Sequence, residues 1–281
     1  MTARHIIFLA FFFLIALQGI KAQANGNWYE KLSDSWKETV SGKLPDTGFF
    51  NTKGDLITLS DVPGEDSWIQ LNEAIEFRAR NRNIHSLEPL RVFTQLEIID
   101  CSSNPIKKIK PLKAMTQLRI LDITETKVSN LAPIRNLELL ELYCGSIVLL
   151  TTIQDLDKMT SLEVLVCSNN SLDHIDAVRK LSNLRILDAS ENYIESVEPI
   201  RQLSLLRELI LFDNPIFEIF YLADLESLEK LHLDATGIFE LRPLDELSKL
   251  SFLSIIETPY LVIEEIERFA THKKDCEILV R

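Results

Sequence analysis

The stretch Leu184–Leu205, LRILDASENYIESVEPIRQLSL, decides the fold because the chain contains it in two similar copies. The earlier copy, LRILDITETKVSNLAPIRNLEL at Leu118–Leu139, matches it at eleven of 22 positions and begins 66 residues before it. Because 66 is three times 22, the spacing predicts further copies at that period. Copies begin at Ala74, Leu96, Leu118, Leu140, Leu162, Leu184, Leu206, Leu228 and Leu250. The sequence therefore predicts an uninterrupted 22-residue period over residues 74–258.

Each copy has the pattern of a strand, a turn and a short helical turn. Positions 3 to 7 alternate, so that Leu187 and Ala189 are expected to face inward while Ile186 and Asp188 face water. Proline favours the first turn of a helix, where its missing N–H is not needed. It occupies position 16 in five copies, as Pro89, Pro111, Pro133, Pro199 and Pro243. No unit can bury its apolar side alone, so the units are expected to stack into a solenoid with one continuous core.

Position 9 carries a polar residue in most copies. It is Asn104, Asn170, Asn192 or Asn214 in four copies and Thr126, Thr236 or Thr258 in three others. An amide at a sharp bend can bond the backbone of its own turn and of the neighbouring turn. The fourth copy, 140–161, has Gly145 and Val148 where leucine and asparagine are usual, and looser order is expected there.

The repeating pattern LxxLxLxxNxIxxIxPLxxL resembles the 22-residue class of leucine-rich repeat, as in bacterial internalins and in the leucine-rich regulator of a protein phosphatase. The resemblance covers residues 74 to about 258. It implies an α/β solenoid, in which a curved array carries a parallel sheet on its concave side and short helical turns on its convex side. It also implies that the chain binds other proteins.

The first residues have the three-part order of a secretory signal peptide. Arg4 precedes an apolar run over residues 6–17, and small residues follow, ending in Ala22-Gln23-Ala24. Cleavage is predicted after Ala24, which makes residues 1–24 a signal peptide and sends the chain to the periplasm or out of the cell. An uncleaved membrane anchor is the alternative, although the run is shorter than the ~20 residues of a spanning helix.

The two ends of a solenoid expose core and need covers. Residues 25–73 are predicted to form the amino-terminal cap, because an apolar stripe at helical spacing runs through Trp28, Leu32, Trp36 and Val40. Residues 259–281 are predicted to form the carboxyl-terminal cap. Apolar residues at helical spacing near Ile263 favour a helix, and the alternation in CEILV, 276–280, favours a closing strand.

The charge argues against two classes of partner. Without residues 1–24 the chain holds 28 basic against 42 acidic residues. A chain this acidic is repelled by phosphate backbones and anionic lipid headgroups. A protein partner is therefore expected, with no nucleic acid and no membrane contact after cleavage, and the chain is expected to be a monomer.

Motifs for catalysis or cofactor binding are absent from the sequence. It contains no HExxH, GxSxG or paired CxxC motif, and its eight glycines do not form a phosphate-binding loop. We expect neither an enzyme nor a bound cofactor. Cys101 and Cys167 fall at an inward position three copies apart, which is too far for a disulfide, while Cys144 is predicted to face the concave side. The four cysteines are expected to be unpaired.

Outward positions 3, 5 and 7 give the candidate binding site. An apolar column is predicted through Ile98, Ile120, Leu142, Val164 and Ile186. Towards the carboxyl end, the predicted partner-binding residues are Ile186, Ile210, Phe212, His232, Asp234 and Phe252. Phe212, His232 and Phe252 are expected to form one aromatic cluster, because neighbouring strands lie ~4.8 Å apart. Large apolar side chains on the wet side of a sheet are typical of protein interfaces.

Several alternatives remain at this stage. The pair of His232 and Asp234 could belong to a metal site, but a solvated polar patch is the simpler interpretation because no third ligand is defined by spacing. Arg78 and Asp100 predict a surface ion pair between the first two strands. For the whole chain, the alternatives to concave protein binding are a structural scaffold of a cell-envelope assembly and a carbohydrate-binding or enzyme-inhibitor role.

Overall fold

The computed structural model describes residues 27–44, 46–57, 71 and 73–280. The predicted signal peptide, 1–24, lies outside the described residues. So does Trp68, which the sequence places in an incomplete repeat before the first full copy.

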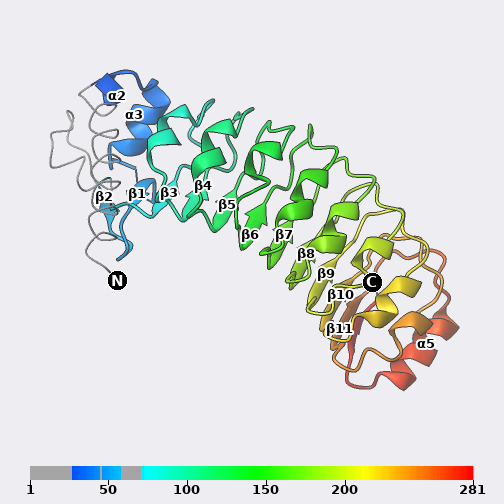
Figure 1. Ribbon diagram of the computed structural model, residues 1–281. Coiled ribbons are helices and arrows are strands. Elements are labelled where there is room, and N and C mark those ends of the chain that lie inside the picture. Colours follow the sequence, from blue (N-terminus) through cyan, green and yellow to red (C-terminus); the bar gives the residue numbers. More distant parts are fainter. Residues whose placement is uncertain (1–26, 45, 58–70, 72, 281) are drawn as a thin grey trace, which may run out of the picture.

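In the described part of the chain, twelve strands form one sheet in the order β12-β11-β10-β9-β8-β7-β6-β5-β4-β3-β1-β2. Their bounds are β1 Gly48–Phe50, β2 Leu56–Ile57, β3 Glu76–Arg78, β4 Ile98–Asp100, β5 Ile120–Asp122, β6 Glu141–Tyr143, β7 Val164–Val166, β8 Ile186–Asp188, β9 Glu208–Ile210, β10 Lys230–His232, β11 Phe252–Ser254 and β12 Glu277–Leu279. Strands β3 to β12 pair in parallel, whereas β1 is antiparallel to both β2 and β3. Figure 1 shows these strands along the inner side of an arc, so the predicted curved solenoid is confirmed.

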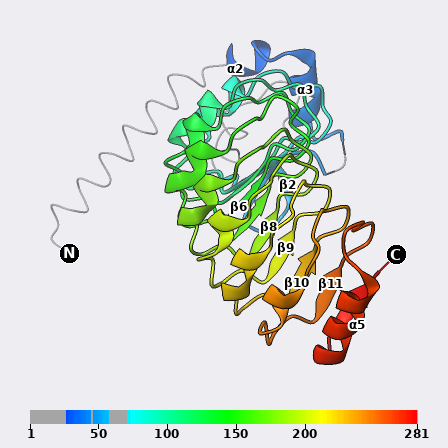
Figure 2. The same cartoon turned by 90° about the vertical axis from the view of Figure 1, so that its right-hand side faces the viewer.

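Short 3-10 helices run along the side opposite the strands. They are η1 Glu88–Val92, η2 Lys110–Ala114, η3 Ala132–Ile134, η4 Gln154–Lys158, η5 Asp176–Lys180, η6 Glu198–Ile200, η7 Phe220–Asp224 and η8 Arg242–Leu244. Proline lies in the first turn of η1, η2, η3, η6 and η8, as the position-16 pattern predicts. Figure 2 shows the helical turns stacked in one layer and the strands in another.

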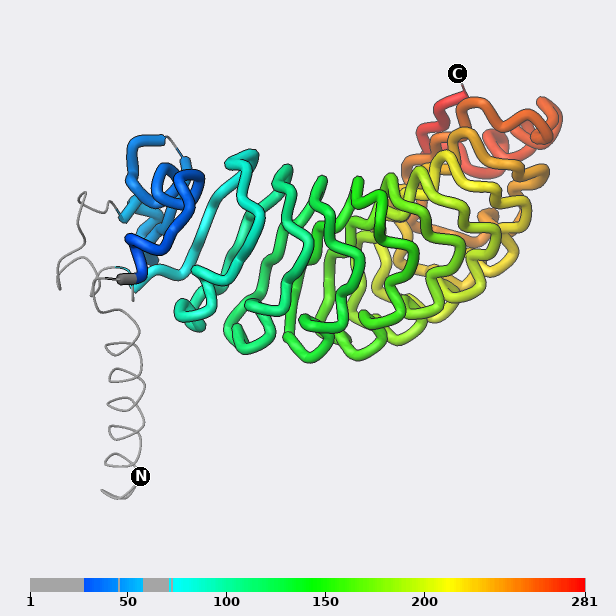
Figure 3. The backbone as a smooth tube through the Cα atoms, turned by 90° about the horizontal axis from the view of Figure 1, so that it is seen from above, coloured from blue at the N-terminus to red at the C-terminus, as the bar shows by residue number. Residues whose placement is uncertain are grey.

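One core runs between these two layers from end to end. Leu187 and Leu209, predicted to face inward, are fully buried. Successive coils stack directly on one another in the backbone trace (Figure 3), so each repeat covers the apolar side of its neighbour.

Among the described residues, three α-helices lie outside the repeats: α2 Asn27–Glu30, α3 Asp34–Val40 and α5 Ile263–His272. At the amino end, the Trp36 ring of α3 stacks on Phe77 of β3 with ring centroids 5.2 Å apart, and its Nε1 donates to the carbonyl of Ser86. At the carboxyl end, Phe269 of α5 is fully buried, and β12 pairs in parallel with β11. Both flanking segments therefore contribute side chains to the common core.

The uninterrupted 22-residue period is wrong at the fourth repeat. Leu142, not Tyr143, pairs in register with Leu121 and Leu165 and is fully buried. The fourth repeat therefore starts at Leu139, so the third repeat has 21 residues and the fourth has 23. The extra residue lies in the turn after β6, where Val148 and Leu149 are 78% and 55% exposed. The third repeat is one residue short and the fourth is one residue long. The two differences cancel, so the repeats before and after them keep the 22-residue spacing.

This shift corrects three predictions. Leu142 does not belong to the outward apolar column, whose member in β6 is Glu141. Tyr143, which a copy beginning at Leu140 places at inward position 4, lies on the outward side of β6, between Asp122 and Val166. Cys144 is fully buried instead of facing the concave side. A one-residue change of register moves every side chain of a strand to its other face, so all three corrections have one cause.

The asparagines of position 9 hold the turns together as predicted. Asn104 is buried, and its Nδ2 donates to the carbonyls of Ala79, Cys101 and Ser102 at 2.7, 3.0 and 2.9 Å. Its Oδ1 accepts from the N–H of Ile84 in the preceding turn. The residue before position 9 adopts a positive φ in each repeat: Asn81, Ser103, Glu125, Ser146, Asn169, Glu191, Asp213, Ala235 and Glu257. This sharp bend leads the chain away from the strand into the turn.

Candidate binding surface on the concave sheet

The concave face consists of two rows of side chains, because each three-residue strand directs its first and third residues outward. The first row is Glu76, Ile98, Ile120, Glu141, Val164, Ile186, Glu208, Lys230 and Phe252. The second row is Arg78, Asp100, Asp122, Tyr143, Val166, Asp188, Ile210, His232 and Ser254. Both outward residues of β3 are charged, β4 and β5 each combine an isoleucine with an aspartate, and apolar residues concentrate in the middle strands.

We call the partly exposed apolar residues of β4 to β9 the concave apolar strip: Ile98, Ile120, Tyr143, Val164, Val166, Ile186 and Ile210. Val164 and Val166 are the two outward residues of β7, and Ile186 pairs in register with Val164. The sequence pattern already placed Val166 at outward position 5, but the prediction overlooked it. Tyr143 was missed because the repeat register changes there.

Tyr143 gives the strip a fixed polar group. Its hydroxyl donates to the carboxylate of Glu141 at 2.7 Å, on the same strand. Burial and this hydrogen bond raise the pKa of Tyr143 to about 12. The phenol therefore stays neutral at physiological pH, and its ring presents an apolar surface with one satisfied hydroxyl.

The predicted aromatic cluster is present as a pair. The rings of His232 in β10 and Phe252 in β11 have centroids 5.0 Å apart, and both side chains are partly exposed. Phe212 follows β9 and is also partly exposed, but it does not appear in the ring contacts of the described residues. Of the predicted site residues, Ile186 and Ile210 lie in the concave apolar strip, and His232 and Phe252 lie beyond its carboxyl-terminal end.

Asp234 has a structural role in the last turns. Its Oδ1 accepts from the hydroxyl of Ser254 at 2.5 Å and from the N–H of Ile256 at 2.7 Å. The carboxylate thus joins repeat eight to repeat nine, in place of the asparagine bonds seen earlier in the array. Among the described residues, no group of three His, Cys, Asp or Glu side chains could hold a metal ion.

Arg78 at the amino-terminal end of the face pairs with a different residue from the one predicted. Its Nε lies 2.6 Å from Glu76 on its own strand, and the guanidinium carbon lies 4.6 Å from the centroid of the Phe50 ring. The ion pair expected with Asp100 is therefore replaced by one within β3, because a carboxylate two residues away lies on the same side of the strand. The guanidinium is partly exposed, so this pair has little effect on stability.

Charged residues border the strip near Ile186. A hollow of about 230 Å³ is lined by Arg185, Ile186, Arg207, Glu208, Glu229 and Lys230. Ion pairs link Arg207 with Glu229 and Lys230 with Glu208 between neighbouring repeats. An apolar centre with a charged, solvent-exposed border is the general composition of a protein interface.

The comparisons with known proteins agree with this geometry. The family model described as "Leucine Rich repeats (2 copies)" matches residues 94–136. Internalin C2 from Listeria monocytogenes is 27% identical over 66% of this chain and 83% of its own, with a TM-score of 0.63. The functional domain of InlJ from the same organism is 20% identical over 91% of this chain and 60% of its own, with a TM-score of 0.62. Among curated proteins, none matches the sequence.

A plant receptor shares the fold at greater distance. The leucine-rich repeat ectodomain of the receptor kinase GASSHO1/SCHENGEN3 from Arabidopsis thaliana, solved in complex with CASPARIAN STRIP INTEGRITY FACTOR 2, has a TM-score of 0.51. It is 21% identical over 61% of this chain and 22% of its own. The repeat geometry and these matches define a leucine-rich repeat protein. Within that class, the chain is similar to the bacterial internalins.

Proposed function

We propose that this chain is an exported protein that binds another protein through its concave sheet. The concave apolar strip carries the proposal: seven side chains on six adjacent strands stay partly exposed although the core beneath them is fully packed. Folding gives no reason for such a row on the wet side of a sheet, whereas binding does. Ile186, Ile210, Phe212, His232, Asp234 and Phe252 are proposed as the carboxyl-terminal part of the contact.

One of the compared structures supports a protein partner. The plant ectodomain that shares the fold was solved with a bound partner. The concave face of this chain is apolar in its middle strands, with charged residues on β3 and on β9 and β10. This distribution suits a protein partner that buries the strip and meets the charges beside it. We propose that the chain acts as a monomer and carries no cofactor and no catalytic residue.

Export rests on the order of Arg4, the apolar run 6–17 and Ala22-Gln23-Ala24. The described residues include no helix that is long and apolar enough to cross a membrane. Amino-terminal sequencing of the exported protein is expected to begin at Asn25. A full-length product that is recovered only by membrane extraction would indicate an uncleaved membrane anchor and not a cleaved signal peptide.

The binding test compares single substitutions on the two sides of the solenoid. A partner captured from the native envelope with the mature wild-type protein is measured by interferometry against Val166→Lys and Ile186→Lys. Each substitution is expected to weaken binding by about tenfold or more, because a charge enters the apolar centre of the interface. The melting temperature should change little, since both side chains lie outside the core.

Phe220→Lys serves as the control. Phe220 begins η7 on the opposite side of the solenoid and is 65% exposed, so it tests the same kind of change away from the concave face. It is expected to keep wild-type affinity. If the two concave variants keep wild-type affinity and Phe220→Lys loses it, the interface lies on the convex side. That result would support the structural scaffold.

A further inference from the structure

The turn edge of the solenoid has two chemically different halves. We use this term for the segment of each repeat that begins at its positive-φ residue and ends at the following helix. That helix is a 3-10 helix in repeats one to eight and α5 in repeat nine. In repeats one to four, which are 81–87, 103–109, 125–131 and 146–153, these segments hold Arg82, Lys107, Lys108 and Lys127 together with His85, and one acidic residue, Glu125. In repeats six to nine, 191–197, 213–219, 235–241 and 257–263, they hold no Lys, Arg or His.

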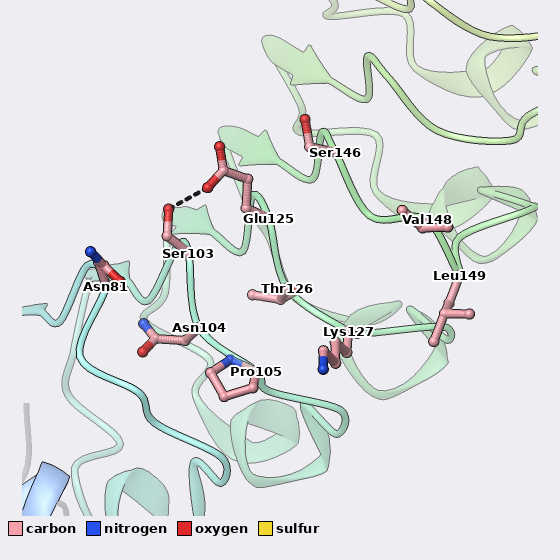
Figure 4. Close-up of a pocket in the computed structure, with 10 residues that line it drawn as sticks. All are labelled: Asn81, Ser103, Asn104, Pro105, Glu125, Thr126, Lys127, Ser146, Val148 and Leu149. Carbon is pink, nitrogen blue, oxygen red and sulfur yellow. Dashed lines mark hydrogen bonds between the residues drawn. The ribbon is translucent and has the colours of Figure 1, made fainter.

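Figure 4 shows part of the basic half, including Lys127. A hollow of about 670 Å³ lies over the turns and is lined by Asn81, Ser103, Asn104, Pro105, Glu125, Thr126, Lys127, Ser146, Val148 and Leu149. Glu125, the one acid of this half, accepts a hydrogen bond from the hydroxyl of Ser103 at 2.7 Å. In this half, the single carboxylate is therefore outnumbered by four basic side chains, which disfavours a cationic partner.

The other half is acidic and aromatic. Its six carboxylates are Glu191, Glu195, Asp213, Glu218, Glu240 and Glu257, and none of them takes part in an ion pair of the described residues. Four aromatic rings stand among them with half or more of their surface exposed: Tyr193 64%, Phe217 50%, Phe239 50% and Tyr260 60%. We call these residues the aromatic turn edge. Its rings lie outside the strand positions, so the alternation within the strands does not predict it.

Phe217 is held in place across two repeats. Its ring centroid lies 6.0 Å from that of Tyr260, although the two residues belong to repeats seven and nine. Between them, in repeat eight, a Cβ on Gly237 would lie only 2.6 Å from a ring carbon of Phe217. Other repeats carry proline, lysine or tyrosine at this position, for example Pro215, Lys127 and Tyr193. The glycine therefore leaves room for the ring to reach the next repeat.

We propose that the aromatic turn edge binds a protein segment rich in arginine or lysine. Cationic side chains stack on the exposed faces of aromatic rings and pair with carboxylates, and this edge offers both without any competing cation of its own. The negative charge of the edge repels acidic partners. A neutral sugar chain would gain no charge–charge attraction from the six carboxylates, whereas a cationic segment would. This surface lies on a different side from the concave sheet, so it stands independently of the function proposed above.

The experiment measures binding of a short fluorescein-labelled peptide in which arginine alternates with leucine, by fluorescence anisotropy with the mature protein. The Phe217→Ala, Tyr260→Ala double variant is expected to bind the peptide with a Kd about tenfold higher than that of the wild type. Gly237→Ala is expected to weaken it several-fold as well, because the new methyl group displaces the Phe217 ring. The Val166→Lys variant of the concave face should bind the peptide within twofold of wild type after allowance for its added charge.

Matched charge variants separate local recognition from general attraction to an acidic protein. Glu195→Gln, Glu218→Gln neutralises two carboxylates of the edge, and Glu264→Gln, Glu267→Gln neutralises two exposed carboxylates on α5. The edge variant is expected to lose at least three times more affinity than the α5 variant. Equal losses would overturn the proposal, because they would show that only net charge attracts the peptide. Thermal melts verify that each variant is folded.

Two further outcomes would also overturn it. A peptide with glutamine in place of arginine that binds as tightly as the arginine peptide would show that the surface recognises apolar groups and not cations. Self-association of the wild type in sedimentation, abolished by Phe217→Ala, Tyr260→Ala, would make a second copy of this chain the occupant.

Discussion

Cys144 and Cys167 occupy the same core position of neighbouring repeats, directly after β6 and β7. Tyr143 pairs in register with Val166, and the N–H of Cys144 donates to the carbonyl of Val166 at 2.8 Å. Both thiols are fully buried and unpaired. Two thiols in the core of adjacent repeats act as small apolar side chains, and their burial keeps them from water-borne reagents.

The four cysteines should therefore react in a defined order. Burial raises the pKa of Cys144 to about 12 and that of Cys101 and Cys167 well above the usual thiol value, so little thiolate forms at pH 8. Cys276 is only partly buried. Alkylation of the native protein followed by mass spectrometry is expected to label Cys276 first and the other three only on unfolding. If Cys144 is labelled as fast as Cys276, its thiol is accessible to solvent and the original assignment to the concave surface is right.

Substitutions in β6 test the register of the fourth repeat. Leu142→Ala is expected to lower the free energy of unfolding by ~2–5 kcal/mol, because it opens a cavity in the core. Tyr143→Ala removes a partly exposed ring and should cost clearly less. Urea melts of the two variants measure the difference. The reverse order would support an uninterrupted 22-residue period, in which Tyr143 is the inward residue.

Asn104 should contribute more to stability than an exposed asparagine. Asn104→Ala leaves the buried carbonyl of Ala79 and the buried N–H of Ile84 without their side-chain partner. An unsatisfied buried group costs ~1–3 kcal/mol, so a loss of at least ~2 kcal/mol is expected in denaturant melts. Asn183→Ala is the control, because Asn183 is exposed and makes one bond to the carbonyl of Thr160. Equal costs for the two variants would contradict a structural role for the position-9 amide.

The carboxyl-terminal segment is predicted to keep the chain soluble. A chain ending at Thr258 loses the buried Phe269, the Arg268–Asp245 ion pair and strand β12, which leaves the edge of β11 unpaired. Exposed core and a free strand edge favour association, so light scattering is expected to detect aggregates. A chain ending at Leu279 retains β12 and should stay monomeric. Monomeric behaviour of the shorter chain at wild-type melting temperature would reject the cap assignment.

The concave face could be predicted for most of its length from local patterns alone. Alternation within each copy indicated that Ile98, Ile120 and Ile186 face outward, and the structure places all three in the concave apolar strip. Alternation works because a strand directs successive side chains to opposite faces, whatever the rest of the chain does. Contacts between repeats could not be predicted in this way. The reach of Phe217 to Tyr260 depends on the space above Gly237, which no periodicity describes.

The repeat pattern in the sequence is sufficient to predict a stack of strand, turn and helical turn, because apolar residues recur at set positions in every copy, with proline at position 16 in five copies and asparagine at position 9 in four. The start of the fourth copy depends on contacts between repeats, so it follows from the tertiary structure alone. Leu139 and Leu140 are both leucine, so either can open the repeat, and a deletion before the strand cancels an insertion after it. The choice is made by β5 and β7, which place Leu142 between Leu121 and Leu165 in the core, since a strand shifted by one residue would bury Tyr143 and expose leucine instead.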